Sequence, residues 1–438
     1  MTGGLMQLVA YGAQDVYLTG NPQVTWFKLI YRRYTNYSME SISQGFTGNT
    51  DFGRRVTATI SRNGDLLHKV FLQVTLPAVA CVAQTHSAVR WCDRVGHALI
   101  SSYELEIGGA KIDKHYGEWL EIWTQLTLPA SKLGGYNRMI GHVTTLHARA
   151  DLNPYTLYVP LQFWFCKNIG LSLPLVALQF HDVKINVEFS SMSSLLIQED
   201  TADVFTGSLS DCSLYCDYIF LDSDERKRFA QSSHEYLIDT LEFNGNESVV
   251  NAITNVQLTF NHPVKFLTFV VQKDEYVTSN YGTLDKTHNQ GFNYTTQLQS
   301  RATVNTTFDE PIDILDSGAV GSGVGPVQKM KLVLNGHDRF TVRPGDYFNL
   351  VQPYSYWPTS PSSPGIYCYS FCLSAAEAQP SGSCNFSRID TAVMQLQFNP
   401  SLFIDSVSQT VGAHFRCYAN NINVLRVMGG MSGLAFSN

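Results

Sequence analysis

Residues 56–76 read VTATISRNGDLLHKVFLQVTL, a stretch that alternates between apolar and polar residues on both sides of an Asn-Gly pair. The alternating apolar residues are Val56, Ala58, Ile60, Val70, Leu72, Val74 and Leu76. A period of two places such residues on one face of a β-strand. Asn63-Gly64 tolerates the positive φ angles of a tight turn, so the stretch predicts two strands joined as a hairpin.

The same combination of apolar alternation and turn residues returns at LEIGG, residues 105–109, and at LVLNG, residues 332–336. Each half of the chain also contains two apolar runs that predict a strand pair. The runs are Leu161, Phe163 and Phe165 with Val183, Ile185, Val187 and Phe189, and Tyr369, Phe371 and Leu373 with Ala392, Met394, Leu396 and Phe398. Phe163 and Phe371 are 208 residues apart, and Phe189 and Phe398 are 209 apart. This constant spacing predicts a duplicated all-β unit.

The first unit contains an insertion. The turns at Gly109 and Gly336 are 227 residues apart, so the first unit holds 227 − 208 = 19 more residues between its turn and its later strands. Residues 114–157 supply the excess, and they include a helical spacing of apolar residues followed by a loop around Gly134-Gly135. The helical residues are Trp119, Leu120, Ile122, Trp123 and Leu126. Insertions of this kind are tolerated at the ends of a β-sandwich.

Eight or so strands in a unit of about 200 residues, joined by long end loops, fit a two-sheet jelly roll. The fold predicted is therefore all-β, with two tandem eight-stranded jelly-roll β-sandwiches (a double jelly roll) and short helices in the loops and the linker. The periodicity by itself leaves other sandwich topologies open.

Residues 221–226, LDSDER, mark the junction between the units, because a capping residue followed by acids predicts a short helix over 223–231. The predicted divisions are an N-terminal arm at 1–25, a first jelly roll at 26–222, a linker at 223–235 and a second jelly roll at 236–438. The arm is expected to be extended and to gain order by contacting neighbours, because it contains Gly3, Gly4, Gly12 and Gly20. Long loops are expected over 277–326.

Composition restricts the class of protein. Single cores stop growing near about 250 residues, so 438 residues predict two domains. Aromatic residues make up 12% of the chain and charged residues only 15%, which favours strands and large buried interfaces. The net charge of −7 lacks the cationic field that phosphate backbones require, so no direct nucleic acid partner is expected.

The lack of a recognisable targeting signal and the pattern of cysteines indicate the compartment in which the chain folds. Residues 1–25 do not have the pattern of a signal peptide, and no apolar run approaches the length of a membrane span. Nine cysteines, an odd number spread over a long chain, predict reduced, buried thiols rather than a disulfide framework. Folding in a cytoplasm is therefore expected.

Several stretches carry a family resemblance. GAQDVYLTGNPQVTWFK at 12–28 continues into YRRYTN at 31–36. Further stretches are ISRNGDL at 60–66, EIGG at 106–109, IDKHY at 112–116, LPLVALQFH at 173–181, DYIFLD at 217–222, FNHP at 260–263, CNFSRID at 384–390 and NVLR at 423–426. Together they resemble the major capsid proteins of nucleocytoplasmic large DNA viruses, and they look most like the algal-virus branch, the phycodnaviruses and chlorella viruses.

The resemblance implies a structural protein of the virion. Such a chain would form homotrimers, whose six similar barrels make pseudo-hexagonal capsomers that tile the icosahedral shell of a large double-stranded DNA virus. Its partners would be itself, neighbouring capsomers and minor capsid proteins beneath the shell, which would surround an internal membrane. Assembly would take place in the host cytoplasm. The sequence contains no convergent set of acid, base or metal-binding residues, so no enzyme activity, cofactor or metal is expected.

Three local patterns suggest chemistry, and each has a simpler interpretation. The Gly-rich residues 318–325 do not lead from a strand into a helix, as a phosphate-binding loop does. Glu118 and Glu121 lie beside Trp119 and Trp123, as in glycosidases, but a spacing of three predicts a solvated helix stripe opposite the tryptophans. The pairs Cys212 with Cys216 and Cys368 with Cys372 are expected to be small buried residues on one strand face, without zinc.

Five sequons are candidate glycosylation sites: Asn36, Asn246, Asn293, Asn305 and Asn385. Asn399 is disqualified by Pro400. Without a signal peptide, host secretory glycosylation is not expected, although the family resemblance leaves virus-encoded glycosylation open. The alternative function is a carbohydrate-binding or carbohydrate-active double β-sandwich, since jelly rolls also form lectins.

Overall fold

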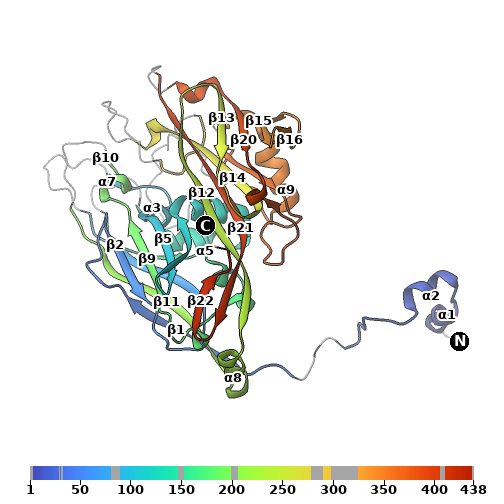
Figure 1. The fold of residues 1–438 in the computed structure, drawn as a ribbon. Helices are drawn as coiled ribbons and strands as arrows, with labels where there is room; N and C mark the ends of the chain where they lie inside the picture. The colour runs from blue at the N-terminus through green and yellow to red at the C-terminus, as the bar shows by residue number, and fades with distance from the viewer. Residues whose placement is uncertain are drawn as a thin grey trace. The chain divides into compact units, whose positions relative to one another are not determined.

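The computed structural model of the chain describes residues 3–28, 30, 33–79, 89–146, 152–198, 206–277, 290–296, 324–404 and 410–436 (Figure 1). The chain forms two compact units, Met1–Tyr37 and Ser38–Asn438.

The first set of eight strands forms two antiparallel sheets. One sheet has the strand order β1-β11-β3-β7, and the other has the order β2-β9-β5-β6. The strands are β1 Tyr37–Gly45, β2 Arg55–Thr59, β3 Leu66–Leu76, β5 Ile100–Ile107, β6 Ala110–Tyr116, β7 Tyr155–Pro160, β9 Val183–Phe189 and β11 Ser210–Leu221. Short β8 (Leu173–Pro174) pairs with β3, and β4 (Val89–Trp91) pairs with β10 (Leu196–Gln198).

The second set repeats this arrangement. One sheet has the order β12-β21-β14-β18, and the other has the order β13-β20-β15-β16. The strands are β12 His234–Val249, β13 Ile253–Leu258, β14 Pro263–Lys273, β15 Val327–Leu334, β16 His337–Asp338, β18 Ile366–Ser370, β20 Ala392–Phe398 and β21 Ala413–Met428. Short β17 (Arg343–Pro344), β19 (Cys384–Asn385) and β22 (Met431–Leu434) extend these sheets.

Both sets therefore have the same topology. When the eight strands of each set are numbered along the chain, one sheet has the order 1-8-3-6 and the other has 2-7-4-5, which is the jelly-roll connection. This confirms the predicted all-β double jelly roll and the internal duplication. It also removes the other sandwich topologies that periodicity left open.

Two of the three predicted hairpins are confirmed, and the third is wrong. Gly108 and Gly109 join β5 to β6, while Asn335 and Gly336 join β15 to β16, all four with positive φ. The strands on either side of Gly64, by contrast, lie in different sheets, since β2 pairs with β9 and β3 pairs with β11 and β7. Glycine is required there by packing, because a Cβ on Gly64 would lie 2.7 Å from the Cβ of Tyr218.

The predicted strand at Leu161, Phe163 and Phe165 is also wrong. Strand β7 ends at Pro160, and α6 (Trp164–Lys167) follows, so the three residues lie in a loop and a helix. All three contribute to the first barrel's core, but so does Trp164 between the last two, so burial here does not alternate as it would in a strand. In the second half, β18 ends at Ser370, so the strand predicted at Tyr369–Leu373 is confirmed only as far as Ser370. Strands β9 and β20 occur where the later runs predicted them.

The helices occupy the connections between strands. They are α3 Val95–Leu99, α4 Gly117–Thr127, α5 Ala130–Met139, α6, α7 Met192–Leu195, α8 Ser223–Gln231 and α9 Gln352–Tyr356, with a π-helical turn, η5, at Tyr347–Val351. Helix α8 is the predicted linking helix, and Asp224 and Glu225 stand in its first turn. Single-turn 3-10 helices lie at 144–146, 169–171, 175–177, 274–276, 386–388 and 400–403.

Three apolar clusters stabilise the unit Ser38–Asn438. The two larger clusters are centred on the two barrels, but the first also contains Ile238 of β12 and Leu425 and Val427 of β21. The third cluster joins one face of α4 to residues of the second barrel, including Phe266 and Tyr418. The inserted segment of the first barrel thus supplies part of the apolar contact between the barrels.

The N-terminal unit differs from the extended segment expected. It contains two helices of seven residues, α1 (Gly3–Val9) and α2 (Ala13–Thr19), and neither buries a residue. Every described side chain before β1 is exposed, including Tyr17 at 90%, Trp26 at 86% and Phe27 at 96%. Helices this short are marginal in water on their own.

Candidate functional site at the junction of the barrels

Helix α4 belongs to the inserted segment of the first barrel and packs against the second barrel. The helix predicted from the apolar spacing is confirmed, and Trp119, Ile122, Trp123 and Leu126 are buried on one face. Gly117 begins the helix where the chain approaches other backbone closely, because a Cβ there would lie 2.1 Å from the carbonyl oxygen of Ile100. The tryptophan face packs on the second barrel rather than only on the barrel to which the helix belongs.

Aromatic contacts form the apolar part of this junction. The rings of Trp119 and Phe266 are stacked with centroids 6.4 Å apart, and those of Trp123 and Phe266 are stacked 6.5 Å apart. Trp119 also lies 5.6 Å from the ring of Tyr418 in β21. The ammonium of Lys167 lies over Trp123 at 3.9 Å from its centroid, a cation–π contact.

The solvated stripe expected at Glu118 and Glu121 is wrong. The Glu118 side chain is 11% exposed, and its Oε1 lies 3.1 Å from Nη2 of Arg416. The hydroxyl of Tyr294 donates to the same oxygen at 3.1 Å, and the hydroxyl of Tyr418 donates to Oε2. All three partners lie beyond the first barrel in the sequence, so one carboxylate joins α4 to the second half of the chain.

Both phenols are held in the protonated, donating form. Burial raises the pKa of Tyr294 and of Tyr418 well above the usual value, and the negative charge of Glu118 raises both further. A carboxylate that accepts from two phenols and an arginine has three of its roughly four acceptor sites occupied. Glu118 is therefore part of a buried ion cluster, which we call the junction clamp (Glu118, Arg416, Tyr294 and Tyr418).

Glu121 belongs to a second buried network within the first barrel. Its side chain is 1% exposed, with Arg94 Nη1 3.1 Å from Oε1 and His97 Nδ1 2.9 Å from Oε2. The side-chain amide of Gln125 donates to Oε1 at 2.6 Å. Burial opposes ionisation, but the charge of Arg94 and the hydrogen bonds from His97 and Gln125 lower the pKa of Glu121 to about 2. Glu121 is consequently ionised at neutral pH.

This arrangement does not favour glycosidase chemistry. That reaction needs one carboxyl group with a raised pKa as proton donor and a second one facing the sugar. Glu121 has a lowered pKa, and both carboxylates accept from donors of the protein itself. No local signal in the sequence identifies Arg416, Tyr294 or Tyr418, because they lie far from Glu118 along the chain.

The cysteines behave as small apolar residues. All eight that the described ranges contain are free thiols, and Cys81 lies outside those ranges. Burial raises the pKa of Cys216 and of Cys368, which keeps both thiols protonated. Cys212 and Cys216 are both in β11, whereas Cys372 lies beyond the end of β18. Among the described residues no three His, Cys, Asp or Glu side chains are grouped to hold a metal ion.

The sequons differ in exposure. Asn36, Asn246 and Asn385 are exposed. Asn293 is 3% exposed, and its amide nitrogen donates to Gln290 Oε1 at 2.7 Å, so it is not accessible for a glycan in this fold. Asn305 and most of the loop 277–326, including residues 318–323, lie outside the described residues.

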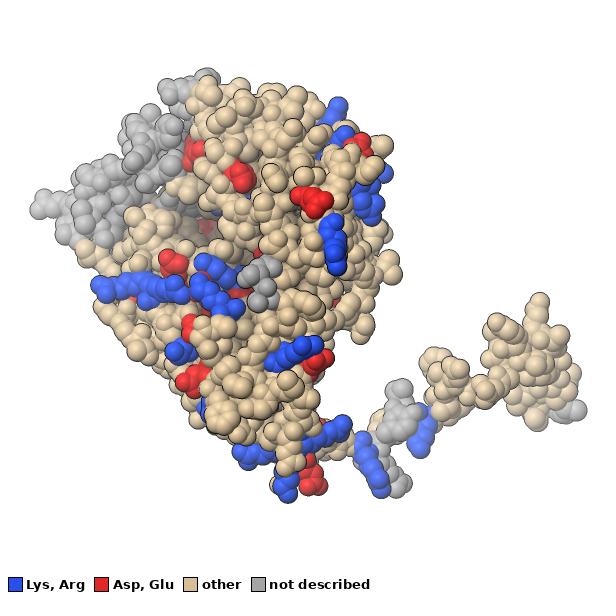
Figure 2. Space-filling model, viewed as in Figure 1, with Lys and Arg blue, Asp and Glu red and all other residues tan. Residues whose placement is uncertain are grey.

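The surface of Ser38–Asn438 carries exposed apolar side chains. Tyr354 is 84% exposed, Leu373 76%, Phe180 74% and Ile253 71%. On the face drawn in Figure 2, charged residues of both signs are interspersed, and wide areas carry neither sign. Single exposed apolar side chains are ordinary on protein surfaces, so these residues do not by themselves mark an interface.

Two family models match the chain. A model of the major capsid protein N-terminus matches residues 25–222, and a model of the large eukaryotic DNA virus major capsid protein matches residues 225–433. The sequence is 44% identical to the major capsid protein of Phaeocystis pouchetii virus over 525 aligned residues, and 40% identical to that of Paramecium bursaria Chlorella virus 1 over 466. Each alignment covers the whole of both chains.

Two solved structures superpose on the chain over most of its length. A chain of the PBCV-1 virus capsid, a quasi-atomic model, superposes with a TM-score of 0.75 and 34% identity, covering 94% of this chain and 100% of that one. The Faustovirus major capsid protein superposes with a TM-score of 0.74, covering 97% of this chain and 96% of that one. At 14% identity the second match shows a shared fold.

Proposed function

The chain belongs to the major capsid proteins of large eukaryotic DNA viruses, and from this we propose that it works as a homotrimeric tile of an icosahedral shell. The observation that carries the proposal is the duplicated jelly roll. Three chains with two similar barrels each present six similar lobes around a three-fold axis, which suits a hexagonal lattice. The carbohydrate alternative has no support from the family models or from the relatives above.

The junction clamp supports the proposal because a tile needs a fixed relation between its barrels. Glu118 of α4 bonds to Arg416 and Tyr418 of β21, and Asp113 of β6 accepts from the backbone N–H of Leu241 in β12 at 3.1 Å. Buried contacts with definite geometry allow fewer arrangements than apolar packing alone. Both barrels of one chain can then meet neighbouring chains at a constant angle.

The partners proposed follow from the family. The chain would contact itself within the trimer, neighbouring capsomers, and minor capsid proteins beneath the shell, with no direct nucleic acid contact. Its place is the capsid of the virion, and assembly in the host cytoplasm around an internal membrane is part of the proposal. No helix in the described part of the chain has both the length and the apolar character to cross a membrane.

Each region of the chain would have its own role in the tile. In this proposal residues 1–25 are the arm, 26–222 and 236–438 are the two barrels of the tile, and 223–235 link them. The arm reaches neighbouring copies, which its two short helices favour, because neither buries a residue and helices of this length are marginal on their own. Asn36, Asn246 and Asn385 stay candidates for glycan attachment, because they are exposed.

The tile predicts a defined mass in solution. At low micromolar concentration, the purified chain is expected to sediment at about 147 kDa, three times its 48.9 kDa. Obligate interfaces commonly bury more than about 2,000 Å² of surface and dissociate little at such concentrations. Sedimentation equilibrium measures this mass, and negative-stain images should show a six-lobed outline. A folded monomer would contradict the trimer.

We also propose that the chain is not an enzyme. Screens for glycosidase, esterase and nucleotide hydrolysis should give only background, because Glu118 and Glu121 are held by donors of the protein. The matched variants are Glu118→Gln and Glu121→Gln, assayed beside the parent chain. Activity that is present in the parent and lost in either variant would show that the site catalyses a reaction.

A further inference from the structure

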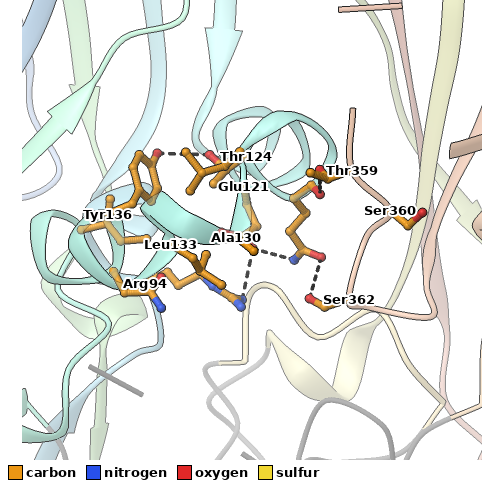
Figure 3. Close-up of a pocket in the computed structure, with 13 residues that line it drawn as sticks. Arg94, Glu121, Thr124, Ala130, Leu133, Tyr136, Thr359, Ser360 and Ser362 are labelled. Atoms are coloured by element: carbon orange, nitrogen blue, oxygen red, sulfur yellow. Dashed lines mark hydrogen bonds and ion pairs between the residues drawn. The ribbon is translucent and has the colours of Figure 1, made fainter. Parts of the chain in front are cut away.

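A cavity of about 180 Å³ opens between α4, α5 and a loop of the second barrel (Figure 3). Leu128, Leu133 and Ile140 belong to its apolar lining, while Arg94 and Ser360 belong to its polar lining and lie on opposite sides of it in Figure 3. A dry apolar cavity of about 150 Å³ can hold benzene, so this volume suits one ring with a small substituent, about eight non-hydrogen atoms.

Arg94 supplies the polar end of the cavity. Its backbone is left-handed, with φ of 52°, a conformation that is costly for a residue with a side chain and that concentrates at functional sites. Its side chain is 13% exposed, and Nη1 lies 3.1 Å from Glu121. A guanidinium carries five N–H donors, so an acceptor atom in the cavity can be bound beside this ion pair.

The charge of the site favours a neutral ligand. Arg94 is paired with a carboxylate that is ionised at neutral pH, so the two charges cancel at the cavity wall. An anion would meet Glu121 and a cation would meet Arg94 at the same end. A hydroxyl or carbonyl group can accept from the guanidinium without either repulsion.

The cavity lies where both barrels contribute. The hydroxyl of Thr359 donates to the backbone oxygen of Gln125 at 3.0 Å, and the hydroxyl of Ser362 donates to Gln125 Oε1 at 3.3 Å. These bonds hold the second-barrel loop against the end of α4. A bound molecule would therefore touch elements of both barrels.

We propose that this cavity binds a small neutral molecule, a single ring carrying one hydroxyl or carbonyl group, with the ring against Leu128, Leu133 and Ile140 and the oxygen toward Arg94. Binding supports the contact between α4, α5 and the second-barrel loop. The proposal does not depend on the shell function. Its failure would not affect the proposed trimer or the assignment of the chain to its family.

Benzyl alcohol is the probe, added to the full-length assembled protein. Saturable binding is expected, with a dissociation constant on the order of 1 mM for so few atoms. Ligand-observed NMR measures the affinity, and the thermal midpoint should rise to a plateau as the site fills. Toluene, which lacks the oxygen, should bind several-fold more weakly.

Leu133→Trp is the test variant, because an indole at this half-buried position of α5 fills the cavity. It should weaken binding at least tenfold. Lys132→Trp is the matched control, since residue 132 is exposed on the same helix and does not line the cavity. The thermal midpoint of each variant without probe shows that it folds.

Three results would overturn the proposal: no saturable binding, equal binding by Leu133→Trp and the parent, or equal binding of toluene and benzyl alcohol. Nuclear Overhauser contacts from the probe ring to the methyl groups of Leu128 and Ile140 give an independent test, which does not rely on a variant. Contacts elsewhere on the surface would count against the site.

Discussion

Replacing Glu118 with alanine is expected to lower the free energy of unfolding by about 3–5 kcal/mol, the usual cost of leaving a buried charge without its partner. The Arg416 side chain is only 18% exposed, so water cannot fully replace the carboxylate. Tyr294 and Tyr418 would also lose their acceptor. Urea denaturation at one fixed protein concentration measures the change, since subunit association also contributes to apparent stability.

An exposed ion pair provides the matched control. Glu235 and Arg426 lie 2.9 Å apart, but their side chains are 63% and 57% exposed. Glu235→Ala should therefore cost no more than about 1 kcal/mol. Glu118→Gln should fall between the two, because its amide oxygen can still accept from one phenol. A loss for Glu118→Ala no larger than that for Glu235→Ala would show that the clamp does not hold the barrels together.

The clamp variant should also affect assembly. If the junction clamp fixes the angle between the barrels, a Glu118→Ala chain that still folds should form fewer regular capsomer arrays than the parent. Electron microscopy of assembly reactions at equal concentration measures this difference. Regular arrays at the parental yield would show that assembly does not need the clamp, whatever the clamp contributes to stability.

Deleting residues 1–22 is expected to leave the barrels folded and to abolish shell assembly. Neither α1 nor α2 buries a residue, and both belong to a compact unit of their own, Met1–Tyr37. Removing them therefore costs the barrels little, and the thermal midpoint should stay within a few degrees of the parent. Particle yield, measured by light scattering and electron microscopy, should fall to background.

A full-length variant separates the arm's chemistry from its length. Tyr17→Ser combined with Leu18→Ser keeps every residue of the arm but removes two side chains that are 90% and 77% exposed. It should impair assembly in the same direction as the deletion. If the truncated chain instead unfolds, the arm belongs to the first core, and the proposal that it contacts neighbouring copies fails.

Local patterns in the sequence determined much of the fold. The alternation at Val70–Leu76 produced β3, and the turn residues Gly108-Gly109 and Asn335-Gly336 produced two hairpins with the positive φ angles expected. The spacing from Phe189 to Phe398 revealed the duplication because equivalent strands β9 and β20 end there. Each of these features depends on residues that are close together in the chain, so periodicity and turn chemistry report them directly.

The sequence pattern failed where distant residues compete with local ones. Asn63-Gly64 has the residues of a hairpin, but its two strands pair with β9 and with β11 and β7, so the chain crosses between sheets. Leu161, Phe163 and Phe165 have the spacing of a strand, but Trp164 lies in the same core as all three, and the backbone there turns and forms α6. An apolar run in a buried loop and helix can thus match the spacing of a strand without forming one.

Only the tertiary structure decided the environment of the two carboxylates. Helical spacing correctly placed Glu118 and Glu121 near the tryptophans, but it could not show that a second barrel covers this part of the helix. Tyr418, a donor to Glu118, lies 300 residues further along the chain. Local periodicity predicts which face of an element is apolar, whereas the pairing of buried charges depends on which distant surface covers it, and that follows only from the packed fold.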